Sequence, residues 1–131
     1  MNNKEIIKYM STSLNRSEYI TIYSDQIIYE KVDEGANKSY KIDIKDSFFV
    51  DAMVLGNIYM PMKKQLVQTY NKVKELDVKD LHRPKNTARK QLLINDNDFN
   101  VSIDMYIQEY GEIFEQLISL IKKTILLQIN R

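Results

Sequence analysis

The stretch that decides the fold is residues 19–44, YITIYSDQIIYEKVDEGANKSYKIDI. Residues 19–23 and 27–32 are rich in β-branched and aromatic side chains, and the polar triplet between them is typical of a tight turn. A second turn at residues 33–37 precedes residues 40–44, where apolar and charged side chains alternate. This pattern predicts a three-stranded antiparallel meander whose last strand has one face exposed to solvent.

Helical spacing predicts three helices around and after this meander. The first is a short helix at residues 3–14, where apolar residues recur every three or four positions. The second, at residues 47–55, follows a capping Asp46 or Ser47 and ends at Gly56. The third begins at Pro61, which suits the first turn of a helix, and runs to about Leu76. Its inward-facing residues are expected to be Leu66, Val67, Tyr70, Val73 and Leu76.

The C-terminal third of the chain predicts a hairpin and a long helix. After an irregular or partly helical stretch at residues 77–89, the apolar runs 92–94 and 99–105 flank a polar turn. A hairpin is favoured here, and extension of the last helix is the alternative. That helix is expected from Tyr106 or Gln108 to Asn130, with a wide apolar stripe. Gly111 would then lie inside the helix, where glycine costs about 1 kcal/mol relative to alanine.

These elements predict a single α+β domain that comprises residues 1–131. The expected fold is an antiparallel sheet, made of the N-terminal meander plus the second hairpin, with helices packed on one face and a long C-terminal helix. The composition, 44% hydrophobic and 28% charged, is ordinary for a globular protein. Because this layout serves chaperones, inhibitors, enzymes and nucleic-acid binders alike, the fold does not decide the function.

The composition excludes several kinds of chemistry. The chain has no cysteine and one histidine, His82, which removes disulfides, thiolate zinc sites and multi-histidine metal sites. Residues 96–100 begin like a calcium loop, but Val101 and Ile107 stand where that loop needs glycine and glutamate. The three glycines lie too far apart for a phosphate-binding loop. We therefore expect no metal site, no cofactor and no enzymatic activity.

Charge is divided between two segments of opposite sign. Residues 61–91 contain nine basic and three acidic residues, whereas residues 95–117 contain six acidic residues and no basic one. On different faces, these segments would give the molecule a basic side that steers binding to a charged partner. Side by side, they would neutralise each other.

The candidate partner-binding residues form two groups. The first is the basic loop, in which Lys and Arg side chains suit phosphates or carboxylates: Lys79, Arg83, Lys85, Arg89 and Lys90. The second is aromatic, because Tyr19 and Tyr23 share one face of their strand and Tyr29 is able to join them. The alternative for the tyrosines is ordinary cross-strand packing beneath the helices.

The sequence therefore favours a small non-catalytic binding protein. Because one compact domain offers no catalytic constellation and no metal site, an inhibitor, immunity or anti-defence factor of a bacterial mobile element is the leading hypothesis. Its expected partner is a protein or a protein–RNA complex. Abundant Lys, Asn, Ile and Tyr indicate an AT-rich genome, which concerns the source and not the function. One alternative is direct nucleic-acid binding through the basic segment from Lys63 to Lys90, against which the pI of about 7.8 counts. The other is an assembly subunit that forms a homodimer through the C-terminal helix.

The sequence also predicts where the protein acts. Its N-terminus lacks the apolar core of a secretory signal, and no run approaches the ~18 apolar residues of a membrane span. A cytoplasmic protein without a membrane partner is expected.

Overall fold

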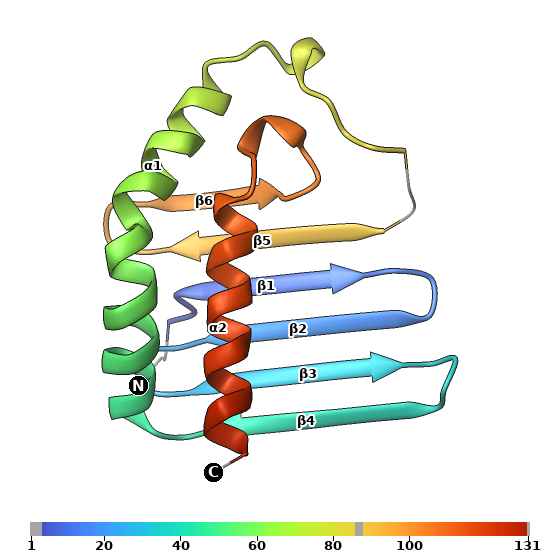
Figure 1. The fold of residues 1–131 in the computed structure, drawn as a ribbon, viewed down its shortest axis with the longest axis vertical. Helices are drawn as coiled ribbons and strands as arrows, with labels where there is room; N and C mark the ends of the chain where they lie inside the picture. Colours follow the sequence, from blue (N-terminus) through green and yellow to red (C-terminus); the bar gives the residue numbers. More distant parts are fainter. Residues whose placement is uncertain (1–3, 86–87, 131) are drawn as a thin grey trace.

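A six-stranded antiparallel sheet forms the base of the protein. The computed structural model describes residues 4–85 and 88–130. The strands lie side by side in the order β4-β3-β2-β1-β5-β6 (Figure 1). Their bounds are β1 Ile7–Thr12, β2 Arg16–Ile22, β3 Ile27–Asp33, β4 Lys38–Ile44, β5 Arg89–Asn95 and β6 Asn100–Asp104.

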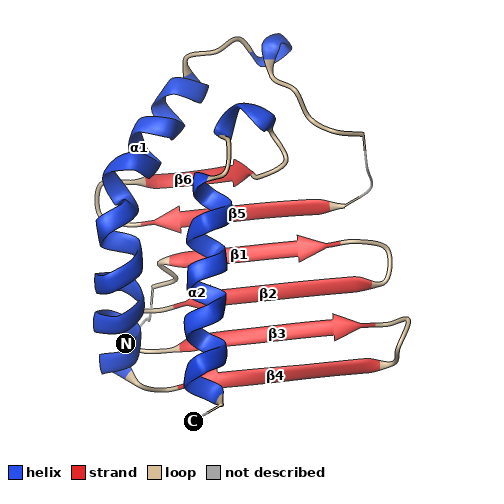
Figure 2. Cartoon of the chain, viewed as in Figure 1, coloured by secondary structure: helices blue, strands red, loops and turns tan. Residues whose placement is uncertain are grey.

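Both hairpin regions predicted from the sequence are confirmed. Strands β2, β3 and β4 form the meander, with Ile20 opposite Tyr29 and Tyr29 opposite Ile42. Strands β5 and β6 form the second hairpin, with Leu92 opposite Ile103. The α+β class, with helices on one face of the sheet, is also as expected (Figure 2).

The N-terminal helix predicted at residues 3–14 is wrong, because this segment supplies strand β1. Its Ile7 and Tyr9 are 1% and 2% exposed, so the apolar period is two residues rather than three or four. Leu14, the last residue of the supposed helical stripe, is 86% exposed. Strand β1 pairs with β2 on one side and β5 on the other, and this central position joins the meander to the second hairpin. Asn3 lies outside the described residues.

The two helices predicted between residues 47 and 76 form one continuous helical segment. A π-helical stretch, η1 (Phe49–Tyr59), leads directly into α1 (Met60–Lys74), so the expected end at Gly56 is wrong. The amide of Met60 donates to the carbonyl of Leu55, five residues back, and α-helical geometry begins next to Pro61. Leu76 was expected to face inward but is 44% exposed, because α1 ends before it.

The last helix, α2 (Ile113–Ile129), begins later than predicted. The chain first makes a short 3-10 turn, η3 (Gln108–Tyr110), and then passes through Gly111 with φ +69° and ψ −144°. This left-handed conformation favours glycine, so Gly111 ends the turn and does not lie inside the helix. Another 3-10 turn, η2 (Val78–Asp80), lies in the otherwise irregular stretch before β5, as the sequence predicted.

One hydrophobic core joins the helices to the sheet. Phe114, Leu117 and Ile121 of α2 are at most 1% exposed and belong to the same cluster as Ile20 and Leu92 of the sheet. Helices η1 and α2 also contact each other, so the helical layer is continuous across the covered face. The strands extend beyond α2 in Figure 1, which leaves one end of that face without a helix above it.

Candidate functional site

Both long helices pack on one face of the sheet, and no described helix or strand covers the opposite face (Figure 2). Strand pairing places Tyr19 beside Met10, and Thr21 between Lys8 and Ile28. Leu93 lies beyond Lys8 on β5. We call this surface the open face.

Apolar and aromatic side chains occupy the middle of the open face. Thr21 is 9% exposed although no helix covers it, because the side chains around it on this face enclose it. The surrounding residues are partly exposed, and none of them is among the residues packed against the core: Met10, Tyr19, Tyr23, Ile28, Val32 and Leu93. Half-exposed aromatic and aliphatic side chains on a rigid sheet are the usual centre of a protein–protein interface.

Charges of both signs lie among and around these apolar side chains, since Lys8 lies between Thr21 and Leu93 and Glu30 lies opposite Tyr19. Register places Lys8, Lys41 and Arg89 on the open face. Glu30, Asp43 and Asp104 lie on the same face. Two side-chain hydrogen bonds, each 2.7 Å long, fix polar side chains near the β4 and β6 edges of this face. Gln26 donates to Asp43, and Gln91 donates to Ser102. A mixed-charge surface of this kind suits a protein surface better than a phosphate backbone, which requires an excess of positive charge.

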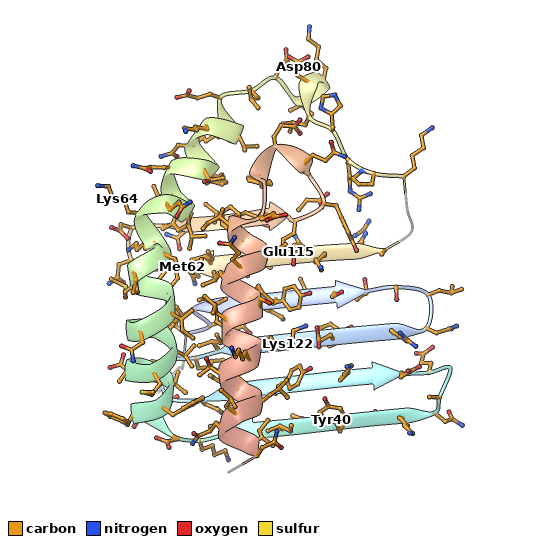
Figure 3. All side chains as sticks on the ribbon, in the orientation of Figure 1. Tyr40, Met62, Lys64, Asp80, Glu115 and Lys122 are labelled. Carbon is orange, nitrogen blue, oxygen red and sulfur yellow. The ribbon has the colours of Figure 1, made fainter. Side chains whose placement is uncertain are left out.

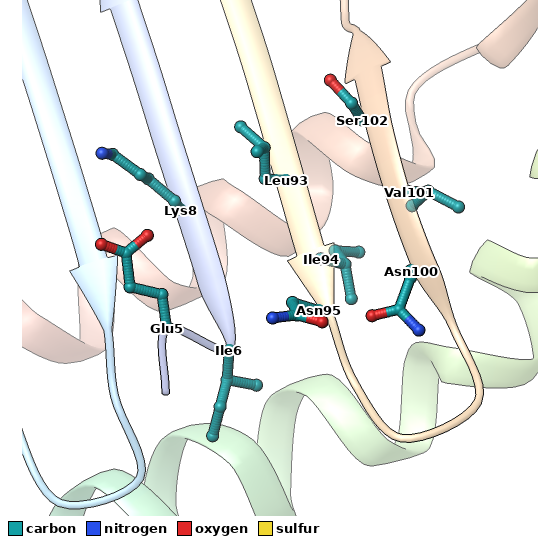
Figure 4. A pocket seen from close by; sticks show the side chains of 9 residues that line it. All are labelled: Glu5, Ile6, Lys8, Leu93, Ile94, Asn95, Asn100, Val101 and Ser102. Atoms are coloured by element: carbon teal, nitrogen blue, oxygen red, sulfur yellow. The ribbon is translucent and has the colours of Figure 1, made fainter. Parts of the chain in front are cut away.

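A hollow of about 330 Å³ extends the open face toward the β5–β6 turn (Figure 4). Lys8 and Leu93 line it, and Asn95 and Asn100 lie at the end near the β5–β6 turn. Its lining therefore combines aliphatic surface with amide groups able to donate and accept hydrogen bonds.

The structure separates the three tyrosines that the sequence proposed as an aromatic site. Tyr19 lies on the open face in β2. Tyr23 follows directly after β2, where its amide donates to the Gln26 carbonyl at 2.8 Å and continues the pairing, so it shares this face as predicted from the spacing. Tyr29 is wrong as a member of this group, because it lies opposite Ile20 on the covered face and is 2% exposed. Its hydroxyl donates to the Glu18 carboxylate at 2.6 Å, and its ring makes an edge contact with Tyr40.

The two charge segments of the sequence lie side by side and pair with each other. Arg83 Nε donates to Asp104 at 2.8 Å, and Lys90 Nζ donates to Glu115 at 2.9 Å. Lys63 contacts Asp96 at 2.7 Å and also Asp98. His82 Nδ1 lies 2.7 Å from Glu109.

The basic residues that the sequence proposed as one site lie in different environments in the structure. Lys79 lies 3.9 Å from Asp77, and Lys90 is half-buried on the covered face. Lys85 and Arg89 are exposed, and Arg89 begins β5 on the open face. Asn86 and Thr87 of this loop lie outside the described residues. The described part of the loop therefore contributes Arg89 to the open face and does not form one continuous basic surface.

Lys122 of α2 bridges the helical layer to the sheet. Its Nζ donates to Glu18 at 2.8 Å and lies 5.9 Å from the centre of the Tyr9 ring. Figure 3 labels Glu115 and Lys122 on α2, where each pairs with a residue of the sheet. Burial by itself would raise the pKa of Glu18, but hydrogen bonds from Lys122 and Tyr29 outweigh it and hold that pKa below 4.5.

This pairing predicts a stability that depends on acid pH. Because the folded-state pKa of Glu18 is lowered, the stabilisation is present above pH 4.5 and is lost as the pH falls through the folded value. Glu18→Gln should therefore melt below the wild type at neutral pH, and this difference should shrink under acid conditions. Thermal melts across that range test it, with Glu34→Gln in the exposed β3–β4 turn as control. A difference that stays constant with pH would contradict the assignment.

Comparison with known proteins does not assign the chain to a family. No protein-family model matches the sequence, and no curated protein matches it significantly. Among the residues that the structure describes, no helix is long and apolar enough to span a membrane. Those same residues contain no group of three or more His, Asp or Glu side chains placed to hold a metal ion.

Sequence reasoning missed Met10 and Leu93 as members of the open face. Both depend on strand β1, whose segment was predicted as a helix. The available signal was the alternation of Ile7 and Tyr9 with Lys8 and Met10, which has the two-residue period of a strand.

Proposed function

We propose that this protein is a small non-catalytic binding protein that docks a folded protein partner on its open face. The observation that carries the proposal is the group of apolar and aromatic side chains around Tyr19 and Tyr23, with charges of both signs among and around it. Inhibition or neutralisation of the partner, as an immunity or anti-defence factor of a mobile element, is the role we propose for such docking.

The mutual pairing of the charged segments favours a protein partner over nucleic acid. Lys63, Arg83 and Lys90 each contact at least one carboxylate at 2.9 Å or less, so phosphate binding would have to break these pairs. Lysine and arginine that neutralise phosphates gain affinity by releasing counterions, and residues already paired to carboxylates lose much of that gain. Direct binding to RNA or DNA is therefore the weaker hypothesis.

We expect alanine at Tyr19 or Tyr23 to weaken partner binding by about 30-fold. Central tyrosines of an interface commonly contribute about 2 kcal/mol or more, and 1.4 kcal/mol corresponds to tenfold in affinity. The measurement has two steps. The wild-type protein first captures a partner from lysate of its host, and each variant is then titrated against that partner.

The matched control is Tyr40→Ala. Tyr40 is 45% exposed in the same meander, but register places it opposite Lys31 on the face that carries the helices. Removal of its ring should leave the affinity within about twofold, since residues outside the interface are near neutral. Equal losses at Tyr40 and Tyr19 would mean that binding does not use the open face. Binding that survives Tyr19→Ala and Tyr23→Ala together would contradict the proposal.

A further inference from the structure

A second apolar surface lies on the outside of the helical layer, away from the open face. The large side chains there are exposed although they lie on two helical segments that pack together. These side chains, which we call the helical patch, are Phe48 at 72% exposed, Met53 at 39%, Leu120 at 46%, Leu126 at 39% and Leu127 at 62%. Ile121, which follows Leu120 in α2, is buried in the core.

The helical patch contains two adjoining hollows that share Leu127. The first, of about 410 Å³, lies between η1 and α2 and is lined by Asp46, Phe48 and Met53. The second, of about 340 Å³, is lined by Lys123 and Leu126 on the other side of α2. One hollow therefore has an acidic edge and a neighbouring hollow has a basic edge.

We propose that the helical patch is the interface through which two copies of this chain form a two-fold symmetric dimer. The five side chains expose on the order of 450 Å², a size at which an exposed apolar patch commonly marks an interface. A standard interface buries about 800 Å² on each partner, of which roughly 55–65% is apolar. The helical patch is therefore large enough to supply the apolar centre of a standard dimer interface.

The order of the charges identifies a second copy as the occupant. In a two-fold dimer the same surface meets itself in reverse, so each residue that contacts a partner residue is contacted by its equivalent in return. With a two-fold axis near Leu127, the first hollow of each copy faces the second hollow of the other copy. This arrangement brings Asp46 of each copy toward Lys123 of the other, so the contact forms twice. The protruding Phe48 of each copy then faces a hollow of the other copy.

Lys123 is available for such a pair. It is exposed, and no ion pair is formed by it within the described residues, whereas the neighbouring Lys122 is bound to Glu18. Asp46 accepts a hydrogen bond from the Phe49 amide through Oδ1, and its other carboxylate oxygen forms no hydrogen bond or ion pair within residues 4–85 and 88–130. The proposal is independent of the partner docked on the open face, because the two surfaces lie on opposite sides of the sheet.

Light scattering across a dilution series tests the dimer. At ~100 µM protein we expect a mass of twice 15.5 kDa, because this concentration exceeds the roughly micromolar dissociation constant of the weakest standard-size interfaces. Leu127→Glu should raise the dimer dissociation constant at least about 100-fold, since it would bury an unpaired charge. Leu14→Glu, at an 86% exposed site outside the patch, should leave it unchanged. A wild type that stays at 15.5 kDa throughout the series overturns the proposal.

A mixing experiment tests the two-fold arrangement. Lys123→Glu and Asp46→Lys should each weaken the homodimer about tenfold, because both contacts then join like charges. Mixed together, the two variants should regain the dimer, since every contact of the mixed pair again joins opposite charges. A thermal melt of Asp46→Lys checks that this variant folds without its hydrogen bond to Phe49. A mixture that remains as monomeric as its components overturns the proposed symmetry. Leu127→Glu should still capture the partner that binds the open face, because the dimer interface and the open face are separate surfaces.

Discussion

Replacing Phe114 by alanine is expected to lower the free energy of unfolding by about 3–5 kcal/mol. Phe114 is 1% exposed in the first turn of α2, and its ring makes an edge contact with Tyr110 at 5.5 Å between centroids. Truncation removes the buried ring and leaves a cavity that the surrounding core residues fill only in part. Replacing Leu117, which is 0% exposed one turn later, by alanine should lower the free energy of unfolding by about 2–5 kcal/mol for the same reason.

Urea unfolding monitored by circular dichroism measures both effects. The midpoint should fall while the slope with denaturant stays constant, because the surface exposed on unfolding changes little. Leu14→Ala is the control for Leu117→Ala, since Leu14 is 86% exposed and should lose less than about 0.5 kcal/mol. A midpoint unchanged in both α2 variants would show that this helix is peripheral to the core.

Gly111→Ala is expected to destabilise the protein by about 1–3 kcal/mol. At φ +69° and ψ −144° a side chain strains the backbone, although no atom lies within 4 Å of the added methyl group. The sign of this effect is informative. If Gly111 lay inside a helix, its replacement by alanine would raise the stability of the protein by about 1 kcal/mol. The two placements of Gly111 therefore predict changes of opposite sign.

The same urea experiment distinguishes the two placements of Gly111. An increase in the midpoint would place Gly111 in a helix and contradict the structure. Gly56→Ala is a useful comparison, because Gly56 lies within η1 at an ordinary backbone conformation. Its added methyl group would lie 3.2 Å from the Asp51 carbonyl, so a small loss there is compatible with the helical placement.

The meander and the second hairpin could be predicted from sequence because their information is local. In residues 19–44 and 92–105, apolar alternation and polar turns determine both the strands and their antiparallel order. The shared face of Tyr19 and Tyr23 follows from the same two-residue period. The buried stripe of α2 was also predictable, since Phe114, Leu117, Ile121 and Ile125 repeat every three or four residues.

What the sequence by itself left undetermined depends on contacts between distant segments. Residues 7–12 fit either a helix or a strand, and the free edges of β2 and β5 decide for a strand by pairing with them. Only the tertiary structure brings Arg83 to Asp104 and Lys90 to Glu115, which turns two opposite charge segments into ion pairs. The open face exists for the same reason: both helical segments pack on one side of the sheet, and which side they choose is a property of the assembled core.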